Sequence, residues 1–195
     1  MKGQRHRSRG LFPLFLLIAP AGCAILGGSG DVFREPTMDF GSLETVAVLP
    51  FQNLAGDEDA AGRVRDTFMG MLLATEAVYV LPAGEVARGI ERAGALSPEG
   101  PSTERLKRLS GVLDVDAVIT GVLREYGTVR SGSASANVVS LSLQMIETVT
   151  GRVVWSAAST KGGITVWDRL FGGGGEPMSK VTEKVVNDLL DKLFD

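Results

Sequence analysis

Residues 139–159 hold the clearest structural pattern in this chain: Val-Ser-Leu-Ser-Leu-Gln-Met-Ile-Glu-Thr-Val-Thr-Gly-Arg-Val-Val-Trp-Ser-Ala-Ala-Ser. Apolar and polar side chains alternate from residue 139 to residue 145, as in a strand with one buried and one exposed face. Residues 148–151 (Thr-Val-Thr-Gly) supply a turn, and residues 152–159 form a second strand-like run. The stretch therefore predicts an antiparallel hairpin.

The segments on either side of this hairpin alternate between strand and helix patterns. Short apolar runs predict three more strands, at residues 45–51, 78–81 and 116–126. Helical spacing of apolar residues predicts four helices, at residues 57–72, 86–93, 102–111 and 177–194. Asp57 is the expected N-cap of the first helix. Together these patterns predict an α+β fold, a single domain with a mixed β-sheet of about five strands and helices packed on its faces.

Three stretches, taken in order, carry a family resemblance. Residues 46–56 read Val-Ala-Val-Leu-Pro-Phe-Gln-Asn-Leu-Ala-Gly, residues 115–121 read Val-Asp-Ala-Val-Ile-Thr-Gly, and residues 150–155 read Thr-Gly-Arg-Val-Val-Trp. Together they resemble the CsgG/LpoB/PelC group of bacterial envelope lipoproteins, over nearly the whole domain. The group includes curli-secretion pores, ring-forming accessories of exopolysaccharide export, and activators of peptidoglycan synthases.

Pore formation is disfavoured among these roles. Pore-forming members insert hairpins at two places, which correspond here to residues 127–137 and 162–176. A membrane-spanning strand takes roughly 9–11 residues, so a spanning hairpin needs two such strands and a turn. Both segments are too short, and we expect residues 127–137 to be a Gly/Ser-rich loop. The sequence therefore favours a member that works by docking or self-association.

Cys23 is the only cysteine, and it follows a basic and then an apolar segment. Residues 11–19 form an apolar run too short to span a bilayer, as in an export signal. Residues 19–23 (Ala-Pro-Ala-Gly-Cys) resemble the lipobox of bacterial lipoproteins, with Pro20 in place of the usual leucine. The resemblance implies cleavage before Cys23, a diacylglyceryl group on its thiol and acylation of the new N-terminus. The alternative is cleavage by ordinary signal peptidase after Ala-Pro-Ala, which releases a soluble protein.

This interpretation divides the chain into three parts. Residues 1–22 are a lipoprotein signal peptide, residues 23–41 are the lipid anchor and a flexible tether, and residues 42–195 are the periplasmic domain. Ala24 after the cysteine implies the outer membrane, by resemblance to lipoprotein sorting rules. The lipid on Cys23 is then the expected membrane contact.

Processing changes the charge and the chemistry of the protein. The full chain carries a formal net charge of −3, and removal of residues 1–22, with four basic residues and no acidic one, leaves −7. A net acidic domain is a poor partner for nucleic acid. The single histidine, His6, is also removed, which excludes Ser–His, Cys–His and typical zinc sites. We therefore expect a protein that is not an enzyme, with no metal and no cofactor.

The remaining candidate site precedes the last helix. Residues 167–171 (Trp-Asp-Arg-Leu-Phe) adjoin four glycines, and Trp167, Arg169 and Phe171 are candidates for a partner-docking patch, with ordinary packing as the alternative. Trp155 is expected in the core.

The combined prediction is an outer-membrane-anchored periplasmic lipoprotein without enzymatic activity. It would serve as an assembly or docking component of an envelope export or secretion complex, with ring-like self-association as one way of acting and docking to such a complex as the other. The alternatives are an activator of a peptidoglycan synthase and a periplasmic module that binds a small ligand or a glycan.

Overall fold

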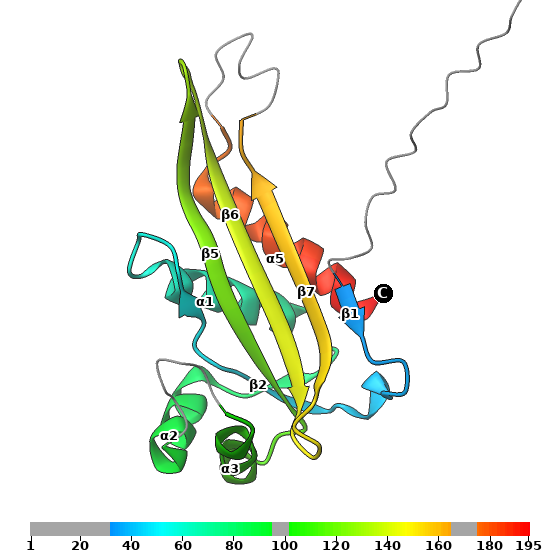
Figure 1. Cartoon of the computed structure of the whole chain (residues 1–195). Helices are drawn as coiled ribbons and strands as arrows, with labels where there is room; N and C mark the ends of the chain where they lie inside the picture. The colour runs from blue at the N-terminus through cyan, green and yellow to red at the C-terminus, as the bar shows by residue number, and fades with distance from the viewer. Residues whose placement is uncertain (1–31, 95–101, 165–174) are drawn as a thin grey trace, which may run out of the picture.

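The computed structural model describes residues 32–94, 102–164 and 175–195. Within them a seven-stranded mixed sheet runs in the order β1-β7-β6-β5-β2-β4, and β3 also pairs with β5 (Figure 1). The strands are β1 (Val32–Arg34), β2 (Thr45–Val48), β3 (Gln52–Asn53), β4 (Tyr79–Val80), β5 (Ala117–Ser131), β6 (Ala134–Glu147) and β7 (Val153–Gly162). The helices are α1 (Ala60–Ala74), α2 (Ala83–Ala93), α3 (Thr103–Leu113), α5 (Met178–Phe194) and a short 3-10 helix at Phe40–Ser42.

The α+β fold expected from the sequence is confirmed. The β6–β7 hairpin places Met145 opposite Trp155 and Leu141 opposite Ser159. The described residues form seven strands rather than about five. The two additional strands, β1 and β3, are three and two residues long, which is too short for an alternating pattern to be recognised.

Helices pack on both faces of the sheet. The residues of β2 show this, because successive side chains of a strand point to opposite sides. Val46 and Val48 are buried in the core shared with α1 and α5. Ala47 and Leu49 belong to a smaller core with α2 and α3. Figure 1 shows α1 and α5 behind the long strands, and α2 and α3 at their lower end. The α2–α3 core therefore covers only one end of its face of the sheet.

Trp155 fixes α5 against the sheet. Its side chain is fully buried, and the indole Nε1 donates a hydrogen bond of 3.0 Å to the carbonyl of Lys192 near the end of α5. Trp155 therefore belongs to the core, as predicted. The predicted stripe of α5 is also buried, at Val181, Val185 and Leu189.

The start of α1 differs from the prediction. The helix begins at Ala60, and the residue at its N-cap position, Asp59, makes no side-chain capping bond. Asp57, the predicted N-cap, forms an ion pair with Arg63 instead. When several acidic residues precede a helix, each is a possible N-cap, so the sequence places the helix start only to within one or two residues. In the structure the first hydrogen-bonded turn begins at Ala60.

Two further expectations are corrected by the strands. Residues 127–137 are not a loop, because β5 continues to Ser131 and β6 begins at Ala134. Gly132, with φ of 59°, lets the chain reverse within two residues. The tether also ends before residue 41, because Phe33 of β1 pairs with Ser156 of β7. In both places backbone hydrogen bonds to a neighbouring strand, rather than side-chain alternation, form the strand.

Candidate functional site: the outer half of the sheet

The three longest strands extend beyond the rest of the sheet. We call residues 124–131 of β5, 134–142 of β6 and 158–162 of β7 the outer half. β2 and β3 pair with β5 only as far as Leu123, and β1 pairs with β7 only as far as Ala157. In the part of the chain that the structure describes, the outer half is thus three strands wide, with an unpaired edge on each side (Figure 1).

One unpaired edge belongs to β7. The carbonyl of Val154 points outward and accepts a hydrogen bond of 2.8 Å from the amide of Glu35. The carbonyl of Ala158 also points outward and accepts one of 2.8 Å from Nζ of Lys192. Alternate residues of a strand direct their backbone groups to the same side, so the amide and carbonyl of Thr160 point outward too. No strand within the described ranges pairs with that side of Thr160.

The other unpaired edge belongs to β5 and follows a bulge. The outward carbonyl of Leu123 accepts a hydrogen bond of 2.9 Å from the amide of Leu54. The register then shifts between Leu123 and Glu125, so one extra residue enters the strand. This insertion moves the outward-pointing positions to Tyr126, Thr128 and Arg130.

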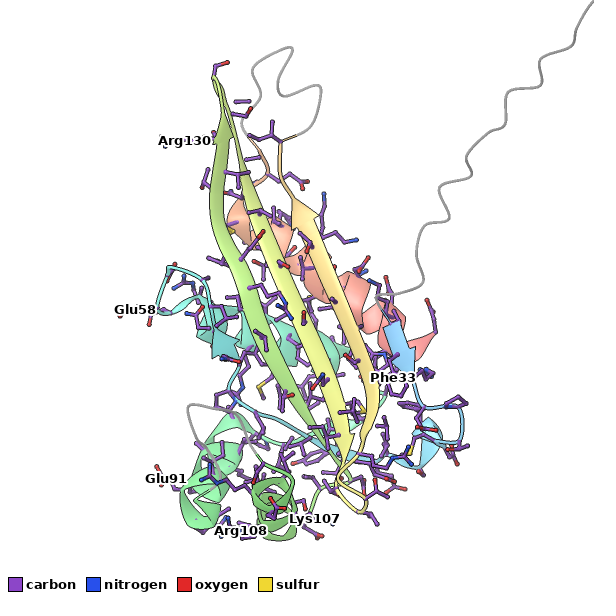
Figure 2. All side chains as sticks on the ribbon, in the orientation of Figure 1. Phe33, Glu58, Glu91, Lys107, Arg108 and Arg130 are labelled. Atoms are coloured by element: carbon purple, nitrogen blue, oxygen red, sulfur yellow. The ribbon has the colours of Figure 1, made fainter. Side chains whose placement is uncertain are left out.

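The β5 edge is covered only where it begins. The guanidinium of Arg63 in α1 lies 5.5 Å from the centre of the Tyr126 ring. Figure 2 shows Arg130 near the tip of the β5–β6 hairpin, well away from the helices. Among the described residues, the edge between these two points carries no partner strand.

Around Ser140, Ser142 and Thr160, the solvent-facing side of the outer half is polar. Ser140 and Thr160 share a hydroxyl–hydroxyl hydrogen bond of 2.8 Å, and Nε of Arg124 donates one of 3.1 Å to Oγ of Ser142. An antiparallel sheet commonly keeps one such face in water. The unpaired edges, rather than this face, are therefore the unusual feature.

A groove of about 940 Å³ lies on the other face, between α1 and α5. Its charged walls are largely neutralised by their own ion pairs. Lys161 pairs with Asp188 and Lys180 pairs with Glu183, and Lys184 lies 2.6 Å from Glu176. A charged ligand would have to displace these pairs, so the groove is a weak candidate for a ligand site.

Asp188 is the centre of this ion-pair network. Partial burial by itself raises the pKa of its carboxyl, but hydrogen bonds from Lys161 and Lys192 outweigh burial and lower the pKa from 3.8 to about 2. Nζ of Lys192 lies 2.9 Å from Oδ2 of Asp188 and also donates to the carbonyl of Ala158. The network fastens α5 to β7 and shields the lower end of the unpaired β7 edge.

The site residues expected from the sequence lie outside the described ranges. They are Cys23, Trp167, Arg169 and Phe171. Their roles therefore stay predictions. The unpaired edges were missed because residues 127–137 resemble a Gly/Ser loop. The signal that favoured a longer strand was the run of β-formers at Tyr126, Thr128 and Val129.

No group of three or more histidine, cysteine, aspartate or glutamate side chains among residues 32–94, 102–164 and 175–195 could hold a metal ion. Within these residues, no helix combines the length and apolar character needed to cross a membrane.

Comparison with known proteins places this domain among bacterial lipoproteins. The GNA1162-like lipoprotein family matches residues 41–195, and the chain belongs to this family. No curated protein matches the sequence.

Solved structures share the fold. PelC from Paraburkholderia phytofirmans, solved as a dodecamer, matches with a TM-score of 0.55 and 18% identity, over 83% of this chain and 95% of that one. GNA1162 from Neisseria meningitidis gives 0.53 and 20%, over 76% and 99%. Protein CT253 from Chlamydia trachomatis gives 0.52 and 12%, over 78% and 96%. The expected likeness to a group that includes PelC is confirmed at the level of the fold.

Proposed function

We propose that this protein is a lipoprotein anchored to the outer membrane through Cys23, with its domain in the periplasm. There it acts as a non-enzymatic assembly or docking component of an envelope export or secretion complex. Membership of the lipoprotein family supports the envelope role. The observation that carries the docking role is the pair of unpaired edges on β5 and β7.

Two different unpaired edges on one domain favour head-to-tail self-association. β5 and β7 run in the same direction, because each is antiparallel to β6. A neighbouring copy related by a rotation can thus place its β5 edge beside β7 as a parallel pair. A contact of this heterologous kind closes into a ring when the rotation does. The dodecamer formed by PelC, which has the same fold, supports a ring as the form of assembly.

Unpaired edges are templates for strand addition unless they are blocked. On β7 the ammonium of Lys192 already donates a hydrogen bond to the carbonyl of Ala158. Thr160 is therefore the next position whose outward backbone groups can pair with another strand. On β5 the outward positions Thr128 and Arg130 follow the stacked Tyr126.

Thr160→Pro tests the β7 edge. Proline removes the outward amide of Thr160 and leaves the ladder to β6 intact, because an outward N–H makes no bond within the sheet. We expect native mass spectrometry of the full chain to show oligomers for the wild type and monomers for Thr160→Pro. The control Thr160→Val loses the same hydroxyl bond to Ser140 but keeps the amide, and it should assemble. A wild type that stays monomeric at high concentration would exclude self-association.

Cys23→Ser tests the anchor. We expect this variant to take up no labelled fatty acid and to leave the membrane fraction. If the wild type takes up no label either and is recovered as a soluble exported protein, the cleavage after Ala-Pro-Ala applies and the anchor is wrong.

A further inference from the structure

An apolar cavity of about 280 Å³ lies where the carboxyl ends of α1 and α5 meet the 3-10 helix. Its floor consists of core side chains, including Leu72, Ile119 and Met145, all at most 3% exposed. Its rim includes Ala77 and Phe194, which are exposed to solvent. The cavity is separate from the outer half of the sheet and plays no part in the proposed strand pairing.

The surroundings of the cavity select a neutral apolar ligand. The charged side chain in its wall, Arg34, donates a hydrogen bond to the carbonyl of Leu193 and stacks at 4.3 Å over the ring of Phe40. Its guanidinium therefore already has partners within the protein, the Leu193 carbonyl and the Phe40 ring. The carboxyl ends of α1 and α5 carry the negative ends of their helix dipoles, which disfavour a bound anion.

The size of the cavity suits part of an acyl chain. An apolar cavity of about 150 Å³ accommodates one benzene molecule, so a cavity of about 280 Å³ takes on the order of a dozen carbon atoms. Flexible alkyl carbons fit such a space more readily than a rigid ring system, because the wall combines residues from six different elements and has no simple shape.

We infer that this cavity binds one acyl chain of the lipid on Cys23, an inference that rests on the lipidation in the proposed function. Arg34, at the end of β1, lines the cavity. Eight residues, 24–31, separate Cys23 from β1, and nine extended steps span roughly 30 Å. Val32, on the same face of β1 as Arg34, is 37% exposed, so an apolar side chain lies between the tether and the cavity wall along the chain.

Binding one chain is compatible with a stable anchor. Lipoprotein processing, as the lipobox implies, leaves three acyl chains, and two lipid chains suffice for firm membrane attachment. The bilayer and the cavity both remove the third chain from water, so the hydrophobic effect alone does not favour one over the other. The short tether between Cys23 and β1 then determines which of the two the chain enters. A chain in the cavity holds the end of the domain formed by β1 and the 3-10 helix against the membrane and orients the outer half away from it.

The test uses cells that produce the full chain and are fed a diazirine fatty acid, which enters the lipid on Cys23. After irradiation, the purified protein is digested and analysed by mass spectrometry. We expect a crosslink between the Cys23 peptide and the peptide that holds Phe40 and Leu43, or the one that holds Leu193. Ala77→Phe, which narrows the rim, should reduce the yield at least fivefold. Ala74→Phe, an exposed position at the end of α1, should leave it unchanged.

The remaining outcomes contradict the inference. A cavity peptide crosslinked to phospholipid would make the bilayer the source of the chain. A lipidated Cys23 peptide without a crosslink to the cavity, or an Ala77→Phe variant that crosslinks like the wild type, would exclude the cavity as the binding site. Absence of lipid on Cys23 would instead show that the proposed anchor has failed, and the mass of that peptide distinguishes this case.

Discussion

Gly121 has no room for a side chain. A Cβ atom there would lie 2.6 Å from the ring of Phe51 and 2.8 Å from a methyl group of Leu143. Phe51 follows β2 and Leu143 lies in β6, so the glycine lets side chains from both sides of β5 close over the same strand. Only a residue without a side chain therefore fits at position 121 without a shift of its neighbours.

Gly121→Ala should lower the free energy of unfolding by about 1–3 kcal/mol, because overpacking forces neighbouring side chains out of their rotamers. The control is Gly127→Ala in the same strand, where an added Cβ atom would meet no other atom within 4 Å. Urea unfolding followed by circular dichroism measures both. Equal destabilisation of the two variants would show that strand propensity, not packing, is responsible.

Asp188 links stability to pH. Its pKa is about 2 in the folded protein and near 3.8 when unfolded, so its stabilising effect is complete above pH 4 and disappears as the pH falls through 2. We expect Asp188→Asn to cost about 1 kcal/mol at pH 7, after solvent screening of a partly exposed network, and to flatten the loss of stability between pH 4 and 2. Asp66→Asn, on the α1 side of the groove, is the control. Parallel pH curves for wild type and Asp188→Asn would contradict this.

At the scale of elements, the bulge in β5 determines which backbone amides face solvent. It moves the outward positions to even-numbered residues, so Thr128 points outward and Val129 bonds to β6 opposite Ala136. The hairpin therefore depends on a single inserted residue for its edge pattern.

Thr128→Pro and Val129→Pro test which residues of β5 point their backbone amides outward. We expect Thr128→Pro to change the unfolding free energy of the monomer by less than about 1 kcal/mol, because no ladder bond is lost. Val129→Pro removes a bond to β6 and should cost about 3 kcal/mol. Thermal unfolding measures the stability of both variants. If Thr128→Pro is the more destabilised of the two, the bulge lies elsewhere in β5.

At the scale of the whole molecule, the two unpaired edges predict how a mixture of two edge variants assembles. Thr128→Pro blocks the β5 edge and Thr160→Pro blocks the β7 edge, so each variant alone should be monomeric. A mixture keeps one working edge of each kind and should form a 1:1 dimer that cannot grow. Native mass spectrometry with one variant isotope-labelled identifies the dimer. A mixture that stays monomeric, or variants that assemble alone, would exclude a β5–β7 contact.

Elements with strong periodicity were predictable from the amino-acid order alone. The alternation from Val139 to Met145 predicted the β6–β7 hairpin, and the apolar stripe at Val181, Val185 and Leu189 predicted α5. These patterns are local, and they reflect which side of an element is buried. The positions of the single cysteine, Cys23, and the single histidine, His6, are likewise read from the chain without a structure.

Strand ends and unpaired edges, by contrast, depend on contacts between distant segments. Residues 127–137 became part of a hairpin because Val129 and Ala136 bond across it, and β1 formed because Phe33 meets Ser156. The candidate site could not be predicted, since an unpaired edge depends on how far distant strands reach along β5 and β7. The cavity beside Arg34 likewise requires α1, α5 and β1 to converge. Such features arise from long-range pairing, which no local period of the sequence records.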